Sequence, residues 1–250
     1  MSRNASVPAE TDILCEHCGY GLNGLPTDGR CPECGEPIAD STVEDGRAMS
    51  PWESGEGSAS RRFLRTTRQV IFSPANFFRH LQTRPPRDLS PSFASRQHWL
   101  NSILFGLTGA IHAEIMGLFD FDFLNTSVVT HWLFVILSVP VLVVLVRLSL
   151  RVITSLASAL TRVEGGYWGY RMPGPAVRRV MNFHTAQLLP VSLLALCTVA
   201  TYSVLRRTDV LNGLYDVRYL VLLSIEVLIG AGYLFRTYWI AMKNIMYANR

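Results

Sequence analysis

At 250 residues, with a net charge of +4 and a mean hydropathy of +0.22, the chain is more apolar than a soluble protein of this size usually is. The composition is also uneven, since residues 1–60 are polar and contain four of the five cysteines, whereas Leu, Val, Ile, Phe and Ala dominate from about residue 99. These apolar runs are long enough to cross a bilayer, which excludes a single soluble domain and indicates an integral membrane protein with a polar N-terminal part.

The first fourteen residues have neither the apolar core nor the small-residue cleavage site of a secretory signal. We therefore expect the cysteine-bearing segment to stay in the cytoplasm, where thiols are kept reduced.

Two CxxC pairs follow, Cys15 with Cys18 and Cys31 with Cys34. Two cysteines three positions apart on a tight turn can both reach one tetrahedral zinc ion at about 2.3 Å, and a second pair completes the site. Four thiolates leave no position for water, so the predicted Zn²⁺ is structural. Two disulfides would need an oxidising compartment, and four free thiols would leave the paired spacing unexplained.

The residues around the cysteines favour turns. Gly19 and Gly35 each follow a pair, and a positive φ there would let backbone N–H groups point at the sulfurs. The segment between the pairs has the Gly, Pro and Asn-Gly content of a short hairpin. We predict a β-hairpin zinc ribbon over residues 11–40.

The predicted ribbon is acidic, with six carboxylates and one basic residue, Arg30, between residues 11 and 40. A surface that binds nucleic acid needs basic groups to neutralise phosphates. The ribbon therefore predicts no nucleic acid and favours a cytosolic protein partner or a role in organising the domain. Residues 41–60, which end in SPWESGEGSAS, have the composition of a flexible linker.

Residues 61–98 precede the apolar runs and contain eight arginines and one acid, Asp88. Apolar side chains alternate with the arginines from Arg61 to Arg84, and Ser73 before Pro74 is typical of a helix start. We expect a pair of amphipathic helices on the inner leaflet. The alternative is that these helices pack only on the protein's own bundle.

Four apolar stretches are long enough to span a membrane as helices, which gives an all-α transmembrane bundle over residues 99–250. They are Trp99–Phe119, Val128–Val146, Val180–Val204 and Tyr219–Ala241. The segment Leu148–Val163 is apolar but interrupted by Arg151, so it is either a fifth span or a helix lying in the interface. The bundle thus has four or five spans.

Arginines dominate two connections that would lie on one side of the membrane. Eight precede the first span, six lie between Arg147 and Arg179, and residues 120–127 contain two aspartates and no basic residue. By the positive-inside rule, the N-terminus is cytoplasmic. We expect the protein to lie in a cell inner membrane. Arg206 and Arg207 would then be outside, against the rule. Four spans place both ends inside, whereas five place them on opposite sides.

The segment CEHCGYGLNGLPTDGRCPECGEPI resembles a zinc ribbon module, Cx2CGYxLxGL…CPECG, of membrane proteins from planctomycete-type bacteria. This resemblance covers about 25 residues and implies metal binding at the four cysteines.

The rest of the chain resembles the Yip domain, the Ypt-interacting-protein superfamily of multi-span membrane proteins. The resemblance rests on FSPANFFRHL at Phe72–Leu81, on the apolar spans that follow, and on the Gly165–Gly166 pair before the third predicted span. The family usually has five spans, and its eukaryotic members act in vesicle trafficking with small GTPases. It implies no catalytic residue.

Several ionisable residues lie inside or at the edges of the predicted spans, where they are costly and often functional. They are His112, Glu114, His184 and Glu226. His112 and Glu114 are two positions apart and point to different helix faces, so they cannot form an HExxH pair. No other catalytic motif is present.

Three functions stay open. We expect a non-enzymatic scaffold or adaptor, in which the ribbon recruits a cytosolic protein and the bundle positions it in the lipid bilayer. The alternative is a small transporter or channel that uses the intramembrane His and Glu residues. An intramembrane enzyme is the third, and it has no motif to support it. The sequence also leaves a homo-oligomer open.

Overall fold

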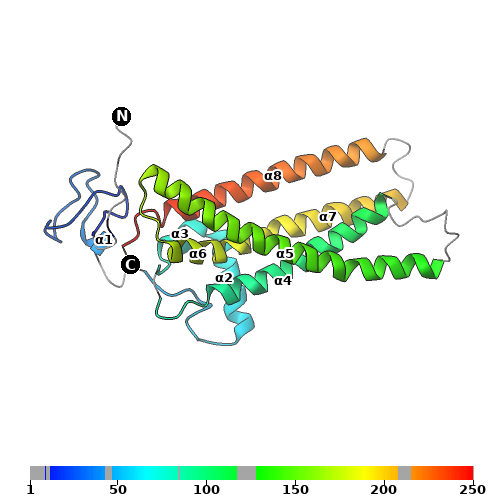
Figure 1. Cartoon of the computed structure of the whole chain (residues 1–250), viewed down its shortest axis with the longest axis horizontal. Helices are drawn as coiled ribbons and strands as arrows, with labels where there is room; N and C mark the ends of the chain where they lie inside the picture. Colours follow the sequence, from blue (N-terminus) through cyan, green and yellow to red (C-terminus); the bar gives the residue numbers. More distant parts are fainter. Residues whose placement is uncertain are drawn as a thin grey trace. The chain divides into compact units, whose positions relative to one another are not determined.

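The computed structural model describes residues 9, 12–42, 47–83, 85–116, 128–207 and 215–249, and this part of the chain is mostly helical. The helices, shown in Figure 1, are α1 (Ala39–Thr42), α2 (Ala59–Phe72), α3 (Pro74–Arg79), α4 (Ser90–Ile115), α5 (Val128–Trp168), α6 (Gly174–His184), α7 (Leu188–Arg207) and α8 (Tyr215–Lys243). A 3₁₀ turn, Thr185–Gln187, joins α6 to α7. The described residues contain no sheet, only isolated bridges.

The chain divides into two compact units. The first consists of Met1–Ala94, Thr154–Ala186 and Arg236–Arg250, and the second of Ser95–Ile153 and Gln187–Phe235. The first unit contains the four N-terminal cysteines, α2, α3 and α6. The second unit contains α7 and the greater part of α4, α5 and α8.

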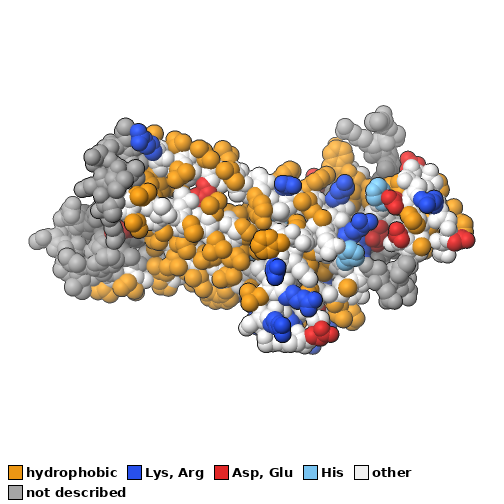
Figure 2. All heavy atoms as spheres, turned by 180° about the vertical axis from the view of Figure 1, so that it is seen from behind, with side chains coloured by type: hydrophobic (Ala, Val, Ile, Leu, Met, Phe, Trp, Pro, Cys, Tyr) orange, Lys and Arg blue, Asp and Glu red, His pale blue; other side chains and the backbone are white. Residues whose placement is uncertain are grey.

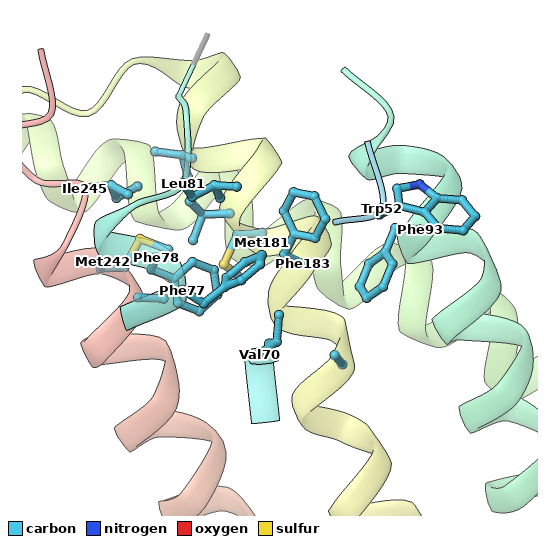
Figure 3. Packing of buried hydrophobic residues seen from close by; sticks show 14 residues of the cluster. Trp52, Val70, Phe77, Phe78, Leu81, Phe93, Met181, Phe183, Met242 and Ile245 are labelled. Carbon is cyan, nitrogen blue, oxygen red and sulfur yellow. The ribbon is translucent and has the colours of Figure 1, made fainter. Parts of the chain in front are cut away.

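The core of the first unit is built from segments that are far apart in the sequence (Figure 3). Val70 of α2, Phe78 of α3 and Phe93 of α4 are fully buried in it. Phe183 of α6 lies at the centre, because its ring is 5.4 Å from that of Phe77 and 5.2 Å from that of Phe93. Aromatic pairs at these distances add to the stability that apolar burial provides.

Part of the segment with linker composition is packed into this core. Trp52 is 6% exposed, and its indole Nε1 donates to the carbonyl of Leu89 at 3.1 Å and to Ser92 Oγ at 3.0 Å. Composition alone did not indicate these contacts, because the partners lie about 40 residues further along the chain. The division into domains near residues 40, 60 and 98 stays a prediction.

The two helices expected before the first span are present as α2 and α3. The side chain of Ser58 caps α2 by accepting from the backbone N–H of Arg61, as Ser does at helix starts. Ser73 is the N-cap of α3 with Pro74 in the first turn, although Ser73 forms no side-chain cap bond. Val70, Phe77 and Phe78 pack in the core, whereas Phe72 is 76% exposed. The contact of these helices with the inner leaflet stays a prediction.

Three helical segments of the described chain are long and apolar enough to cross a membrane, namely Ile136–Trp168, Gly174–Arg206 and Val217–Lys243. Apolar side chains cover much of the visible surface over the long helices (Figure 2). Such a surface is unusual for a soluble protein and indicates contact with lipid. The membrane protein predicted from composition is therefore supported, while the number of four or five spans is not confirmed.

Residues 148–163 form neither a separate span nor a separate interfacial helix, because they continue the helix of the second predicted span. Both belong to α5, which is 41 residues long and so measures about 60 Å at 1.5 Å per residue. A bilayer core is about 30 Å thick, so about half of α5 suffices to cross it. Local hydropathy identifies the two apolar parts of α5, residues 128–146 and 148–163. It does not show that the helix continues from one part into the other.

The third predicted span is divided between α6, the 3₁₀ turn and α7. Pro190 therefore lies in the first turn of α7, where its missing N–H would have no intrahelical partner anyway. The fourth predicted span, Tyr219–Ala241, lies within α8. The first, Trp99–Phe119, lies in α4 up to Ile115, and its last residues fall outside the described part of the chain.

Small and polar residues bring the helices of the second unit together. A Cβ on Gly106 of α4 would lie 2.6 Å from Val143 Cγ2 of α5, so only glycine permits this approach. Ser192 Oγ donates to Asn101 Oδ1 at 2.8 Å, which joins α7 to α4. These contacts are those of a helical bundle.

Candidate metal centre

Each CxxC pair forms its own tight turn, and the second turn repeats the first sixteen residues later. In the first, the N–H of Cys15 donates to the carbonyl of Tyr20 at 2.8 Å, and that of Leu22 to the carbonyl of Ile13 at 2.7 Å. In the second, Cys31 donates to Glu36 at 2.8 Å and Ile38 to Gly29 at 3.0 Å. The bridges Leu14–Gly21 and Arg30–Pro37 show the same offset.

This arrangement differs from the predicted β-hairpin. The hairpin was expected between the pairs, over residues 19–30, but each pair instead lies at the tip of its own turn. Only one bridge closes each turn, so neither flank is long enough to form a strand of a sheet. Leu22 and Ile38, at equivalent positions, are each 2% exposed and pack with Cys15 and Cys31 in a small core.

The four cysteine sulfurs lie within 4.8 Å of one another, which is metal-binding distance. Two contacts join the two turns, Cys15 to Cys34 and Cys18 to Cys31, each with sulfurs 3.6 Å apart. A disulfide needs about 2.05 Å, so these cysteines are free thiols. Ligands at about 2.3 Å in a tetrahedron are about 3.8 Å apart, so the set fits one tetrahedral ion.

The turns also direct backbone N–H groups at the sulfurs, as the glycines predicted. Gly19 has φ +82° and Gly35 has φ +74°. The backbone of Tyr20 donates to the sulfur of Cys18, and that of Glu36 donates to the sulfur of Cys34. Such bonds stabilise thiolates and are the usual support of a sulfur-ligated metal.

The thiols nevertheless differ in acidity. Burial raises the pKa of Cys18 to about 12. Burial acts in the same direction on Cys31, but the backbone N–H groups of Cys34 and Glu33 outweigh it and lower its pKa to about 7. Without a metal, at least one of the four ligands therefore holds its proton at neutral pH.

The C-terminal segment binds the first turn through Asn249. The Asn249 side chain accepts from the backbone N–H of Leu14 at 2.8 Å and donates to the carbonyl of Leu14 at 2.7 Å. Its amide also donates to the carbonyl of Ser41 at 2.8 Å. The ring of Tyr247 lies against Gly19, where a Cβ would come within 2.5 Å of it. Residues more than 200 positions away thus form part of the ribbon's surroundings.

Two arginines complete this attachment. Arg171, 4% exposed, donates to the carbonyls of Asp12 and Ala248 and to Asn249 Oδ1. Arg47 forms an ion pair with Glu16 at 2.8 Å and donates to the carbonyl of Asn244 at 3.1 Å. The ribbon is therefore held to the end of α8 by a polar network inside the first unit.

The intramembrane residues singled out from the sequence are distributed over both units, and their grouping into one site stays a prediction. His184 lies in the first unit, where its Nε2 is 3.0 Å from Thr237 Oγ1. His112 lies in the second unit, with its Nδ1 2.7 Å from the hydroxyl of Tyr219. Glu226, also in the second unit, has both carboxylate oxygens buried without a hydrogen-bond partner among the described residues. In the part of the chain that is described, the four cysteines are the one group of metal-binding residues.

Glu114 lies near the end of α4 and forms part of the second unit. It does not join His112 in a group of metal-binding residues within the described chain. A helix separates side chains two positions apart by about 200°, which places the two residues on different faces of α4.

Sequence reasoning missed the residues that hold the ribbon, namely Arg47, Arg171, Tyr247 and Asn249. Nothing in the local sequence marks them, because each acts through partners far away in the chain. The repeat at an offset of sixteen, C-x-x-C-G-x-x-[LI], was visible in the sequence and would have predicted two equivalent turns in place of one hairpin.

No family model matches the chain, and no curated protein or solved structure matches it either. The resemblances to the planctomycete-type ribbon module and to the Yip domain therefore stay predictions.

Proposed function

We propose that this protein is a non-enzymatic membrane adaptor in which a structural Zn²⁺ organises a ribbon that presents an acidic surface to a cytosolic protein. The observation that supports it is the arrangement of the four cysteines, each pair in a tight turn with sulfurs at tetrahedral spacing. Four thiolates favour Zn²⁺ among the common metals and complete its coordination. Such a site builds structure and leaves no position for a substrate.

The attachment of the ribbon leaves an acidic surface available for a partner. Glu16 is paired with Arg47, but four further carboxylates of the ribbon are exposed: Asp28, Glu33, Glu36 and Asp40. A surface of this charge repels nucleic acid and suits a basic protein surface. We therefore propose a protein partner and no nucleic acid.

We further propose four spans, formed by the helical segments of the second unit. These segments of α4, α5, α7 and α8 each contain 20 residues or somewhat more, which matches about 30 Å of hydrocarbon. The guanidinium of Arg147 lies 3.8 Å from the centre of the Trp99 ring, and such Arg and Trp pairs are typical of the membrane interface. The second half of α5 then extends beyond the hydrocarbon.

With four spans, both ends of the chain lie on one side, and the arginines of α2, α3 and α6 make that side the cytoplasm of a cell inner membrane. The proposal includes the bacterial, Yip-like character that the resemblances imply. The topology is testable by fusing alkaline phosphatase or green fluorescent protein at residue 124 and after residue 250. We expect phosphatase activity only at the first position and fluorescence only at the second. Fluorescence at the first position or phosphatase activity at the second would contradict this topology of four spans with both ends in the cytoplasm.

The adaptor function is testable by placing a photoreactive amino acid at Glu33, on the exposed ribbon surface, and irradiating living cells. We expect a discrete cross-linked protein that disappears in the Cys31→Ser/Cys34→Ser variant at equal membrane levels. The control places the same amino acid at Glu56, which is exposed outside the ribbon. Cross-links that are identical at both positions, or that persist without the cysteines, would refute recruitment by the ribbon.

One observation favours a second function, a small transporter. Both oxygens of Glu226 are buried among the described residues without a hydrogen-bond partner, and buried carboxylates inside membranes often bind protons or cations. In that case Glu226→Gln would abolish proton-coupled uptake into proteoliposomes, while Glu56→Gln would not. Equal proton flux in both variants and in empty liposomes would exclude this function.

A further inference from the structure

A cavity of about 210 Å³ lies in the first unit, between the end of α5, the loop that follows it and the end of α8. None of the four cysteines lines it. A water molecule occupies about 30 Å³ in the liquid, so the cavity has room for a group of several heavy atoms. Drug-sized ligands need about 300–1,000 Å³, so the cavity suits a small headgroup or solute.

The walls combine aromatic rings with one carboxylate. The polar and aromatic lining residues are Glu164, Trp168, Tyr170, Tyr238 and Trp239. Of the described residues that line the cavity, Glu164 alone is charged, and no cationic side chain takes part. Ring faces carry negative potential, so these walls attract a cation that also has apolar surface.

Methionines form the rest of the apolar lining. Met242, in α8, and Met246, in the turn after α8, are both buried. Met172 contributes from the loop after α5. Gly165 lets this loop approach, because a Cβ there would lie 2.9 Å from Met172 Sδ. Thioethers are polarizable and pack well against irregular apolar groups. A compact hydrated cation has no such groups, so the methionines favour a ligand that carries them.

The carboxylate is available for a ligand. Glu164 is exposed, and within the described residues it forms no salt bridge. The hydroxyl of Tyr238 interacts with Glu164 and lies 2.9 Å from Thr161 Oγ1, so a hydrogen-bonded pair orients the acid on the cavity wall.

Large rings remain exposed at the same place. Trp168 is 56% exposed and Trp239 is 47% exposed, although both line the cavity. Trp side chains are on average highly buried, so two exposed indoles at one cavity are unusual. Among aromatic rings, an indole face attracts a cation most strongly.

We propose that this cavity binds an alkylated ammonium group, carried either by a soluble molecule or by a lipid headgroup. The methyl groups contact the rings and the methionines, and the positive charge faces Glu164. A metal ion or a primary amine is a poorer match, because both keep a tight water shell that this lining cannot replace.

The test uses the full-length protein in a maltoside detergent and tetramethylammonium as the probe, observed by saturation-transfer NMR of its methyl protons. We expect saturable binding that equal concentrations of sodium chloride do not compete away. Glu164→Gln should weaken the binding of tetramethylammonium by roughly tenfold, because the cation loses its nearby negative charge. Glu56→Gln, an exposed acid outside the cavity, should bind like the wild type.

Trp168→Ala is a second variant at an exposed position, and it should weaken binding without lowering the metal content that reports a folded ribbon. Binding that is absent in the wild type, or unchanged in both Glu164→Gln and Trp168→Ala, would overturn the proposal.

Nanodiscs distinguish the two sources of the group. If a headgroup is the ligand, tetramethylammonium binds in phosphatidylglycerol discs and is displaced in phosphatidylcholine discs. If the ligand is soluble, it binds equally in both. Either result supports the ammonium site, whereas binding in neither lipid would count against it.

Discussion

Arg179 of α6 shows how a single buried side chain ties distant segments of the first unit together. Its guanidinium forms ion pairs with Glu53 and with Asp88, the latter at 2.8 Å, and its Nε donates to the carbonyl of Gln82 at 2.8 Å. The Arg179 and Glu53 side chains are each 1% exposed. Since removing charges from water is costly, this pair is stable only while every partner remains in place.

Arg179→Ala should therefore destabilise the first unit by about 3–5 kcal/mol, because it leaves Glu53 buried and unpaired. The neighbouring Arg178 is exposed, so Arg178→Ala is a matched control and should change stability by less than about 0.5 kcal/mol. Thermal unfolding of both variants in detergent measures the difference. Equal melting temperatures would mean that the ion pair contributes little.

Gly19 and Gly35 occupy equivalent positions of the two turns, but their surroundings differ. Both have positive φ, so alanine should cost about 1 kcal/mol of backbone strain at either site. Only at Gly19 would the Cβ also meet the Tyr247 ring, whereas nothing lies within 4 Å at Gly35. We expect Gly19→Ala, and not Gly35→Ala, to release the C-terminal segment, as measured by hydrogen exchange of residues 244–249. Equal exchange in the two variants would show that Tyr247 does not hold the turn.

Metal affinity should depend on pH through the thiols. Cys18, with a pKa raised to about 12, holds a proton at neutral pH that metal binding must displace, so affinity falls as the pH falls. Cys31, with a pKa lowered to about 7, gains a proton only below that pH. Chelator competition between about pH 6 and about pH 8 should give a plot of log affinity against pH that is steeper below pH 7. A constant slope would contradict the low pKa of Cys31.

At the scale of elements, the ribbon consists of two equal turns and not of one hairpin. The spacing of the cysteines was sufficient to predict the metal-binding group, because two CxxC pairs on tight turns can supply four ligands to one tetrahedral ion. It was not sufficient to predict the backbone between the pairs, where Gly and Asn-Gly suit several turns. The hydrogen bonds that repeat from Cys15 to Cys31 settle which turns form.

Helices α4 and α5 approach closely at Gly106, and this contact provides a test of the second unit. Gly106→Ala should destabilise it by about 1–3 kcal/mol, because the new Cβ would lie 2.6 Å from Val143 Cγ2 and 3.1 Å from its backbone nitrogen. Gly109→Ala on the same helix meets only Leu142 at an ordinary 3.5 Å and is the control. Thermal unfolding in detergent should separate the two variants, and equal stability would mean that the helices can move apart without cost.

At the scale of the whole molecule, a polar network joins the N-terminal ribbon to the C-terminal segment inside the first unit. Backbone groups of both segments take part in hydrogen bonds with Asn249, Arg171 and Arg47. Folding of the ribbon therefore favours an ordered C-terminal segment, and the reverse also holds. A metal that folds the ribbon therefore also stabilises the end of α8.

Chelation of the metal should consequently affect two distant segments and leave the helices intact. We expect one zinc ion per chain by elemental analysis, lost with a chelator and in the Cys31→Ser/Cys34→Ser variant. The helical circular dichroism should change little, while protease cleavage appears both within residues 12–42 and near residue 244. Cleavage confined to the ribbon would show that the C-terminal segment is stable without it, and zinc that remained in the variant would reveal a second site.

The sequence by itself determined the features that depend on near neighbours: the thiol set, the turn glycines, the helix start at Ser73, and the apolar runs that make this a membrane protein. Tertiary structure decided what depends on distant partners. It made 148–163 the continuation of one helix, packed Trp52 and Glu53 of a linker-like segment into a core, and joined Asn249 to Leu14. The reason is physical, because spacing and periodicity report only local geometry, whereas a buried ion pair or an amide contact depends on which distant groups the folded chain brings within about 3 Å.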